Sequence, residues 1–263
     1  MTGMNRFSAN LGFLWAELSV FEQIERAAAE GFGAVEMHWP YAEDPKALRA
    51  ACAAAGVELL ALNTPLGNTE QGDFGLAALA GREAAFREGF LMAAEYAVAA
   101  GASKLHVMAG VGPNNARTRQ IFAQNLLWAE AQAPELTLLL EPLNNFDKPQ
   151  YFYHLPEHAL AIINSADLQR TKLMFDAYHV GREGYDPVRE YDRCAPFIGH
   201  IQIAGVPHRH EPYSGQVDFE RFLTHLAAKK YTGWVGCEYK PERGEEAGMA
   251  RLRQLSDLLL PID

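Results

Sequence analysis

Several features that define other classes of protein are scarce or missing in this 263-residue chain. Its three cysteines, Cys52, Cys194 and Cys237, are too few and too scattered for a disulfide framework or a cysteine-ligated zinc site. No uninterrupted apolar run reaches the roughly 18 residues that span a bilayer, and no signal-peptide pattern opens the chain. These absences predict a cytoplasmic protein with buried thiols and no membrane partner.

Positive charge is also in short supply. The chain has 23 Lys and Arg residues against 33 Asp and Glu, which gives a formal net charge of -10. Because phosphate binding requires clustered basic residues, this balance weighs against nucleic acid as a partner. No G-x-G-x-x-G motif or P-loop follows any apolar run, which weighs against an open nucleotide-binding fold.

What the chain does contain is a regular alternation of strand-like and helix-like segments. Strands are predicted at residues 7–12, 34–38, 57–63, 104–109, 137–141, 173–179, 198–205 and 234–241. Helices are predicted at residues 19–30, 44–55, 82–100, 118–133, 156–165, 187–194, 218–229 and 245–260. Eight such units without a composition break predict one α/β domain over residues 1–263, an eight-stranded parallel (β/α)8 TIM barrel.

Local signals mark several of the predicted boundaries. Residues 19–22 have the spacing of a capping box, and Asp44 precedes a proline at the first position of a helix. Gly31 and Gly56 suit the left-handed turns that end helices. Residues 64–81 form a long connection of the kind that often acts as a lid.

Four consecutive predicted strands each deliver one oxygen-bearing side chain near their carboxyl ends. In a parallel barrel these ends converge on one face, the face that carries the active site. Any one of these side chains alone could be an interior polar group hydrogen-bonded to the barrel rim, but four in succession favour a shared site. The four residues are Glu141, Asp176, Gln202 and Glu238.

Three carboxylates gathered at an apolar barrel mouth repel one another, so a cation must be present or some must be protonated. A set of oxygen ligands without cysteine suits a divalent ion such as Mg²⁺ or Mn²⁺ better than a structural zinc. The sequence therefore predicts a divalent metal cofactor.

Six segments of the chain resemble the hydroxypyruvate isomerase family, within the larger group of xylose-isomerase-like barrels. They are RFSANL, EPLNNFD, FDAYH, HIQIA, RHEP and GWVGCEYKP, and the likeness runs through almost the whole chain. The resemblance implies that Glu141, Asp176, Gln202 and Glu238 bind the metal, and that the two glutamates act as acid and base. It implies an isomerase that interconverts hydroxypyruvate and tartronate semialdehyde, or acts on the related 2-oxo-tetronate, through an enediolate. The metal would stabilise the enediolate charge, and the sequence does not assign which glutamate acts first.

The same resemblance suggests how a small hydroxy-oxo acid would be bound. Arg209 matches a family arginine and offers a fork suited to a carboxylate, whereas the alternative is a solvated loop arginine. His179 matches a family histidine that contacts substrate oxygens. Lys240 lies two residues beyond Glu238 and would share its strand face. Weaker candidates, for which ordinary packing is the alternative, are Asp147, Asn63, His106, Glu36 and His38.

Other functions stay open on the sequence. Ketose 3-epimerases share the barrel but carry histidine at the position of Gln202, so the glutamine favours the isomerase. An endonuclease IV-like nuclease would need a histidine-rich metal cluster and a basic face. A non-catalytic metal-binding barrel and a homo-oligomer are both compatible with the chain. Gly205 and the histidines beside Arg209 depart from the family pattern, which bears on the substrate more than on the chemistry.

Overall fold

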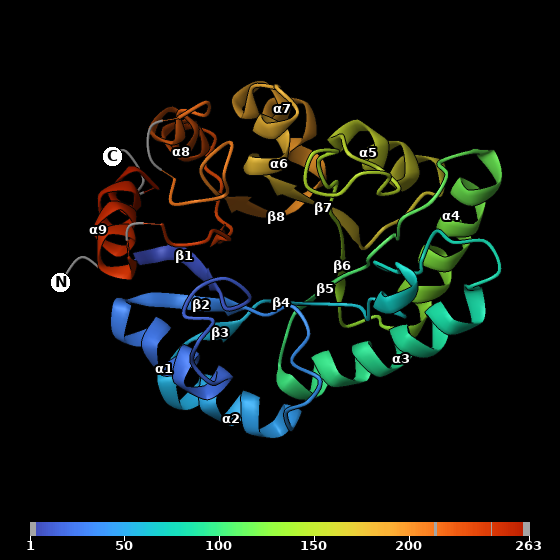
Figure 1. Ribbon diagram of the computed structural model, residues 1–263, viewed down its shortest axis with the longest axis horizontal. Coiled ribbons are helices and arrows are strands. Elements are labelled where there is room, and N and C mark those ends of the chain that lie inside the picture. Colours follow the sequence, from blue (N-terminus) through green and yellow to red (C-terminus); the bar gives the residue numbers. More distant parts are fainter. Residues whose placement is uncertain (1–3, 213–214, 243, 260–263) are drawn as a thin grey trace.

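The computed structural model describes residues 4–212, 215–242 and 244–259. The strands are β1 (Met4–Asn10), β2 (Phe32–Glu36), β3 (Glu58–Leu59), β4 (Ala61–Asn63), β5 (Lys104–His106), β6 (Thr137–Leu140), β7 (Thr171–Asp176), β8 (Ile198–Ile203) and β9 (Val235–Cys237). All pair in parallel, in the order β3-β2-β1-β9-β8-β7-β6-β5-β4. The helices surround this sheet (Figure 1). The predicted parallel barrel is therefore confirmed.

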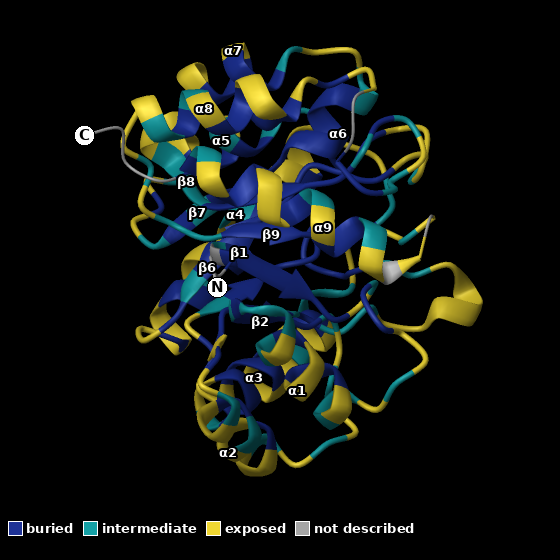
Figure 2. Cartoon of the chain, turned by 90° about the vertical axis from the view of Figure 1, so that its left-hand side faces the viewer, coloured by how far each residue is buried: buried dark blue, intermediate teal, exposed yellow. Residues whose placement is uncertain are grey.

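The α-helices alternate with the strands along the chain. They are α1 (Val20–Glu30), α2 (Pro45–Ala55), α3 (Glu83–Ala100), α4 (Ala116–Gln132), α5 (Pro156–Ser165), α6 (Ala177–Arg182), α7 (Pro187–Cys194), α8 (Phe219–Ala228) and α9 (Glu245–Ser256). Short 3-10 turns are η1 (Thr69–Gln71), η2 (Ala195–Phe197) and η3 (Asp257–Leu259). The strands are buried, whereas the helices expose their outward faces (Figure 2).

The barrel has nine described strands rather than the predicted eight because one predicted strand is split. Residues 57–63 form β3 and β4, which are separated by Leu60. β3 pairs with β2 and β4 pairs with β5. Leu60 bridges the split, since its N–H donates to the Val35 carbonyl at 2.9 Å and its carbonyl accepts from the Lys104 N–H at 3.0 Å. The two pieces thus act as one strand that closes the barrel.

The predicted helix boundaries rest on local hydrogen bonds that the structure contains. Ser19 and Glu22 form a reciprocal capping box at the start of α1. The Asp44 carboxylate accepts the Ala47 N–H at 2.8 Å at the start of α2. Gly31 and Gly56 have φ angles of 93° and 71°, which other residues adopt only at a cost.

One predicted strand ends earlier than expected. The strand placed at residues 173–179 ends at Asp176, and α6 begins at once. The reason is local, because the Asp176 side chain accepts the Tyr178 N–H at 2.8 Å and so caps the helix. β9 likewise ends at Cys237, and the predicted end of the last helix at residue 260 lies outside the described residues.

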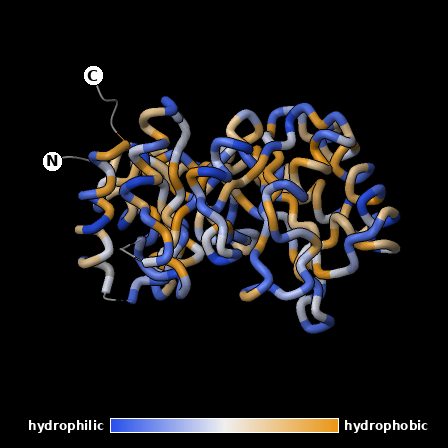
Figure 3. Tube along the Cα trace, turned by 90° about the horizontal axis from the view of Figure 1, so that it is seen from above, coloured by the Kyte–Doolittle hydropathy of each residue, from blue (hydrophilic) through white to orange (hydrophobic). Residues whose placement is uncertain are grey.

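A large apolar core fills the space between the barrel and its helices, and a smaller cluster is separate from it. The smaller cluster consists of Ala34, Leu60, Ala61, Leu139 and Met174. Hydrophobic and hydrophilic residues alternate along the outer helices (Figure 3). Among the described residues, no helix is long and apolar enough to cross a membrane.

Candidate active site

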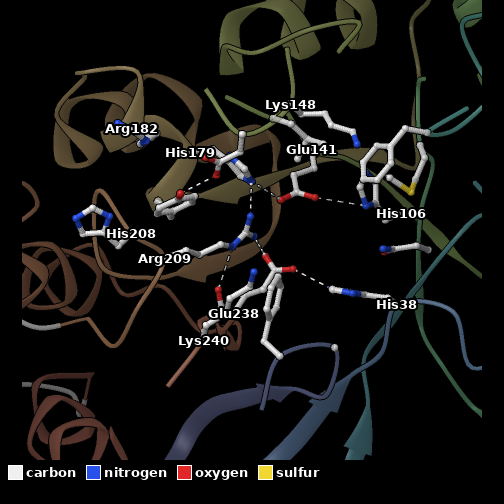
Figure 4. A pocket seen from close by; sticks show the side chains of 18 of the residues that line it. His38, His106, Glu141, Lys148, His179, Arg182, His208, Arg209, Glu238 and Lys240 are labelled. Carbon is white, nitrogen blue, oxygen red and sulfur yellow. Dashed lines mark hydrogen bonds and ion pairs between the residues drawn. The ribbon is translucent and has the colours of Figure 1, made fainter. Parts of the chain in front are cut away.

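A cavity of about 680 Å³ opens where the strands end. Two of the predicted site residues, Asp176 and Gln202, do not line it but lie buried beside it. They face each other in the β7–β8 register, and Asp176 Oδ2 is 3.3 Å from the guanidinium of Arg209 at the cavity wall. The predicted residues that line the cavity are His38, Asn63, His106, Glu141, Asp147, His179, Arg209, Glu238 and Lys240. All of them except Asn63 and Asp147 are labelled in Figure 4.

Glu238 is a buried carboxylate held by a guanidinium, an imidazole and an amide. Its Oε2 is 2.5 Å from Arg209 Nη2, and its Oε1 is 3.0 Å from His38 Nε2 and accepts from Asn10 Nδ2 at 3.2 Å. Burial raises the pKa of Glu238, but Arg209 and His38 outweigh burial and lower this pKa to about 2. Glu238 is therefore ionised at neutral pH, which is the state a base requires.

Glu141 has the opposite electrostatic environment. His106 Nδ1 lies 3.5 Å from its Oε2 and His179 Nε2 lies 3.5 Å from its Oε1, and the buried Oε1 has no hydrogen-bond partner among the described residues. Burial, followed by the charges of Glu238 and Asp176, raises the pKa of Glu141 well above its ordinary value. The pKa values of the two glutamates are thus shifted in opposite directions, as those of an acid and a base are.

Arg209 is fixed by its backbone and by aromatic rings. Its φ of 59° lies in the left-handed region, and its N–H donates to the Gly205 carbonyl at 2.8 Å. The guanidinium carbon lies 5.0 Å from the Phe13 ring centre and 4.9 Å from that of Tyr178. Its ion pairs with Glu238 and the buried Asp176 show that it is part of the carboxylate cluster rather than a solvated loop residue.

The hydrogen bonds of His179 assign its tautomer. The backbone N–H of Asn144, which can only donate, points at Nδ1 from 3.1 Å. Burial lowers the pKa of His179 well below its usual value, so the ring is neutral and carries its proton on Nε2. His179 Nε2 lies 3.5 Å from a carboxylate oxygen of Glu141 and 3.5 Å from one of Asp176. Arg209 Nη1 lies 3.3 Å from the same nitrogen, and because both groups are donors, this is a close contact rather than a hydrogen bond. His179 is arranged to donate to an oxygen.

Glu36 determines how the amide of Gln202 is turned. Gln202 Nε2 donates to Glu36 Oε2 at 2.8 Å, which leaves the buried Oε1 without a partner among the described residues. Ser8 Oγ donates to Glu36 Oε1 at 2.5 Å, and His200 Nε2 lies 3.0 Å from the same oxygen. The sequence pointed to Glu36 only through its place on strand two; its partners come from other strands.

The interior around Gln202 depends on the absence of a side chain at Gly236. A Cβ there would lie 2.3 Å from Glu36 Oε1 and 2.8 Å from Gln202 Cγ. We expect Gly236→Ala to lower the free energy of unfolding by about 1–3 kcal/mol, as overpacking of a core does. Urea denaturation measures this change. Gly89→Ala is the control, since its Cβ would meet Pro65 Cγ at an ordinary 3.5 Å and should leave stability equal or higher.

The remaining predicted residues have less direct roles. Asp147 lines the cavity, but its Oδ2 already accepts from Tyr178 at 2.6 Å and from Asn144 at 3.1 Å. Lys240 is exposed at the cavity rim; because β9 ends at Cys237, strand alternation does not explain its position. The Asn10 and His38 contacts to Glu238 escaped sequence reasoning, although each residue ends or follows a predicted strand.

The buried residues fit a divalent cation. A carboxylate oxygen of Glu141, one of Asp176 and a ring nitrogen of His179 lie within 4.8 Å of one another. The two oxygens can bind an ion, whereas the Nε2–H of His179 faces them as a donor. The unpartnered Oε1 atoms of Glu141 and Gln202 are free to act as ligands. Burial raises the pKa of Asp176 to about 7 and raises the pKa of Glu141 well above its ordinary value, as expected of buried carboxylates with too little positive charge nearby. Oxygen donors of this kind suit hard ions such as Mg²⁺ or Mn²⁺.

Comparison with known proteins gives consistent relatives. Residues 24–255 match the family model described as xylose isomerase-like TIM barrel. The chain is 39% identical to a 2-oxo-tetronate isomerase of Cupriavidus necator, over 95% of this chain and 98% of that protein. It is 36% identical to the hydroxypyruvate isomerase of Escherichia coli, over 94% and 97% of the two chains.

A solved structure shares nearly the whole architecture. The crystal structure of a protein named AP endonuclease, family 2, from Brucella melitensis superposes with a TM-score of 0.91 at 31% identity. The match covers 95% of this chain and 98% of that one. A D-psicose 3-epimerase structure, at 16% identity and a TM-score of 0.78, shares the fold.

Proposed function

The chain belongs to the hydroxypyruvate isomerase family of xylose isomerase-like TIM barrels and is an isomerase, and we propose that it converts a small hydroxy-oxo acid with the help of a divalent metal ion. The proposed substrates are hydroxypyruvate and the longer 2-oxo-tetronate. One observation carries the proposal above all: Glu141 and Glu238 face one cavity with pKa values displaced in opposite directions.

Isomerisation of hydroxypyruvate moves one carbon-bound proton. A base removes a proton from C3, the carbon beside the C2 carbonyl, which gives an enediolate. An acid then protonates C2, and the proton of the C3 hydroxyl passes to the oxygen on C2, so that C2 becomes a hydroxyl carbon and C3 an aldehyde. We assign the base to Glu238, because it is ionised, and the acid to Glu141, because its pKa is raised.

Neighbouring residues would position the substrate. The Nε2–H of His179 would donate to a substrate oxygen beside the reacting carbons, and the guanidinium of Arg209 would hold the carboxylate. Glu141, Asp176, Gln202 and Glu238 would bind the metal, which supplies positive charge where the enediolate oxygens develop negative charge. The support for this set is its buried oxygens and the two unpartnered Oε1 atoms.

Purified protein should convert hydroxypyruvate, 2-oxo-tetronate or both, and a chelator should abolish the conversion. We expect less than a tenth of the activity after chelation and recovery of activity on adding Mg²⁺ or Mn²⁺. Without the ion, the negative charges of the carboxylates are not neutralised and the charge of the enediolate is not stabilised. Product formation is followed by NMR. Full activity in the presence of chelator would refute the metal requirement.

Two further substrates test the rival functions. A ketohexose would be epimerised at C3 if the protein were a ketose 3-epimerase, and DNA with abasic sites would be cut if it were a nuclease. We expect neither reaction, since the formal net charge of -10 disfavours DNA and the isomerase relatives span nearly the whole chain. Turnover of the ketose or the DNA without turnover of either acid would overturn the proposed function.

A further inference from the structure

We propose that His106 and Lys148 form a second subsite of the cavity, which binds the C4 hydroxyl of a four-carbon 2-oxo acid. The inference rests on the proposed function and selects between its two substrates. Both residues line the cavity, and Figure 4 shows them beyond Glu141, on the side away from Arg209 and His208. The preferred substrate is therefore an acyclic 2-oxo acid with a hydroxyl one carbon beyond the reacting pair.

His106 is a buried imidazole with unused hydrogen-bonding capacity. Its side chain is 1% exposed, and neither ring nitrogen has a hydrogen-bond partner among the described residues. A neutral imidazole offers one donor and one acceptor. Buried polar atoms without partners are rare in folded proteins. A hydroxyl, which donates and accepts, is the complementary ligand.

Lys148 brings an unpaired positive charge to the same side of the cavity. Its ammonium lies 3.5 Å from the ring centre of Phe74, another cavity residue. Within the described part of the chain, no carboxylate is within ion-pair distance of this ammonium. An ammonium in this position can donate to the oxygen of a hydroxyl whose proton is accepted by His106.

The subsite would lie at the end of the substrate away from its carboxylate. Arg209, which pairs with Glu238 at 2.5 Å, would take the carboxylate at C1, and the two glutamates would act on C2 and C3. His106 Nδ1 lies 3.5 Å from Glu141 Oε2, on the side of the glutamates away from Arg209, where the chain beyond C3 would extend. Hydroxypyruvate ends at C3 and leaves both His106 and Lys148 unused in a cavity of about 680 Å³.

The test compares 2-oxo-tetronate with its 4-deoxy analogue, 2-oxo-3-hydroxybutanoate, which differs only by the C4 hydroxyl. The wild-type protein should favour the hydroxylated acid in kcat/KM by at least tenfold, about the effect of leaving a buried donor or acceptor unpaired. Lys148→Met and His106→Leu should each reduce this ratio at least fivefold. His106→Gln keeps a donor and an acceptor, so it should retain part of the preference for the hydroxylated acid.

A ratio is used because it is insensitive to a general loss of folded protein. Lys46→Met is the matched control, since Lys46 is exposed on α2 and outside the cavity, and its ratio should equal the wild-type value. An unchanged ratio in both Lys148→Met and His106→Leu would overturn the subsite. Failure of the proposed function looks different, because then the wild-type protein converts neither acid.

Discussion

Replacing Glu238 with glutamine will lower kcat by about 10³- to 10⁴-fold, the contribution expected of a positioned general base. The amide keeps the shape of the side chain and an oxygen for a metal, but it cannot accept a proton. Glu238 is the residue for which this loss is expected because its carboxylate is ionised, buried and held from both sides by Arg209 and His38. Steady-state kinetics with hydroxypyruvate and 2-oxo-tetronate measures the change.

Solvent exchange separates the two proposed proton transfers. In D₂O, Glu141→Gln should still allow Glu238 to remove and return the C3 proton, so deuterium enters the substrate while little product forms. Glu238→Gln should block exchange as well as product formation. If instead Glu238→Gln exchanged and Glu141→Gln did not, the order of base and acid would be the reverse of that proposed.

A buried carboxylate far from the chemistry provides the control for these variants. Glu130 is 9% exposed and accepts the Arg170 N–H and the Thr171 hydroxyl, each at 2.8 Å, at the start of β7. Glu130→Gln makes the same chemical change beside the first residue of β7, at the end of the barrel opposite the proposed site. It should lower stability and leave kcat unchanged. A comparable loss of kcat there would mean that the effect at Glu238 is structural.

The convergence of the carboxylates could be predicted because it follows from two local facts. Each apolar run ends at a polar residue, and parallel strands bring the polar residues at their carboxyl ends to one face of the barrel. Glu141, Asp176 and Glu238 therefore approach one cavity whatever the details of the packing. The capping box at Ser19, the Asp44 cap and the glycines that end α1 and α2 were equally predictable, since each depends on residues within one turn of chain.

The partners of those carboxylates could not be predicted, because they depend on how the barrel closes. His38 and Asn10 reach Glu238 only because β1 lies between β2 and β9. The bond from Gln202 to Glu36 crosses the barrel interior between residues 166 positions apart. The short helix α6 was missed because FDAYH continues the apolar pattern, and only the cap made by Asp176 interrupts it.

Replacing Arg209 with methionine will damage both the stability of the metal-free protein and its activity. The change leaves Glu238 and Asp176 buried without their cation, and loss of one partner of a buried ion pair typically costs about 3–5 kcal/mol. The variant also lacks the fork proposed for the substrate carboxylate, so kcat/KM should fall by about 10²-fold, mainly through KM. Urea unfolding after chelation measures the first effect.

The stability loss should depend on pH in a defined direction. Arg209 helps to lower the pKa of Glu238 from an ordinary 4.5 to about 2. The ionised Glu238 therefore stabilises the wild-type protein above pH 4.5, and this contribution disappears as the pH falls toward 2. The difference between wild type and Arg209→Met should be largest at neutral pH and should shrink on acidification. A difference that is constant with pH would indicate lost packing against Phe13 and Tyr178 rather than lost charge.

Arg209→Lys distinguishes the two roles of the residue. An ammonium can still neutralise Glu238, so most of the stability at neutral pH should return. It cannot reproduce the planar fork that holds a carboxylate through two parallel hydrogen bonds, so KM should stay high. If lysine restored KM together with stability, the guanidinium would act only as a counter-charge to the glutamate. The substrate carboxylate would then have to be bound elsewhere in the cavity, and Lys240 at the rim is one cation placed to bind it.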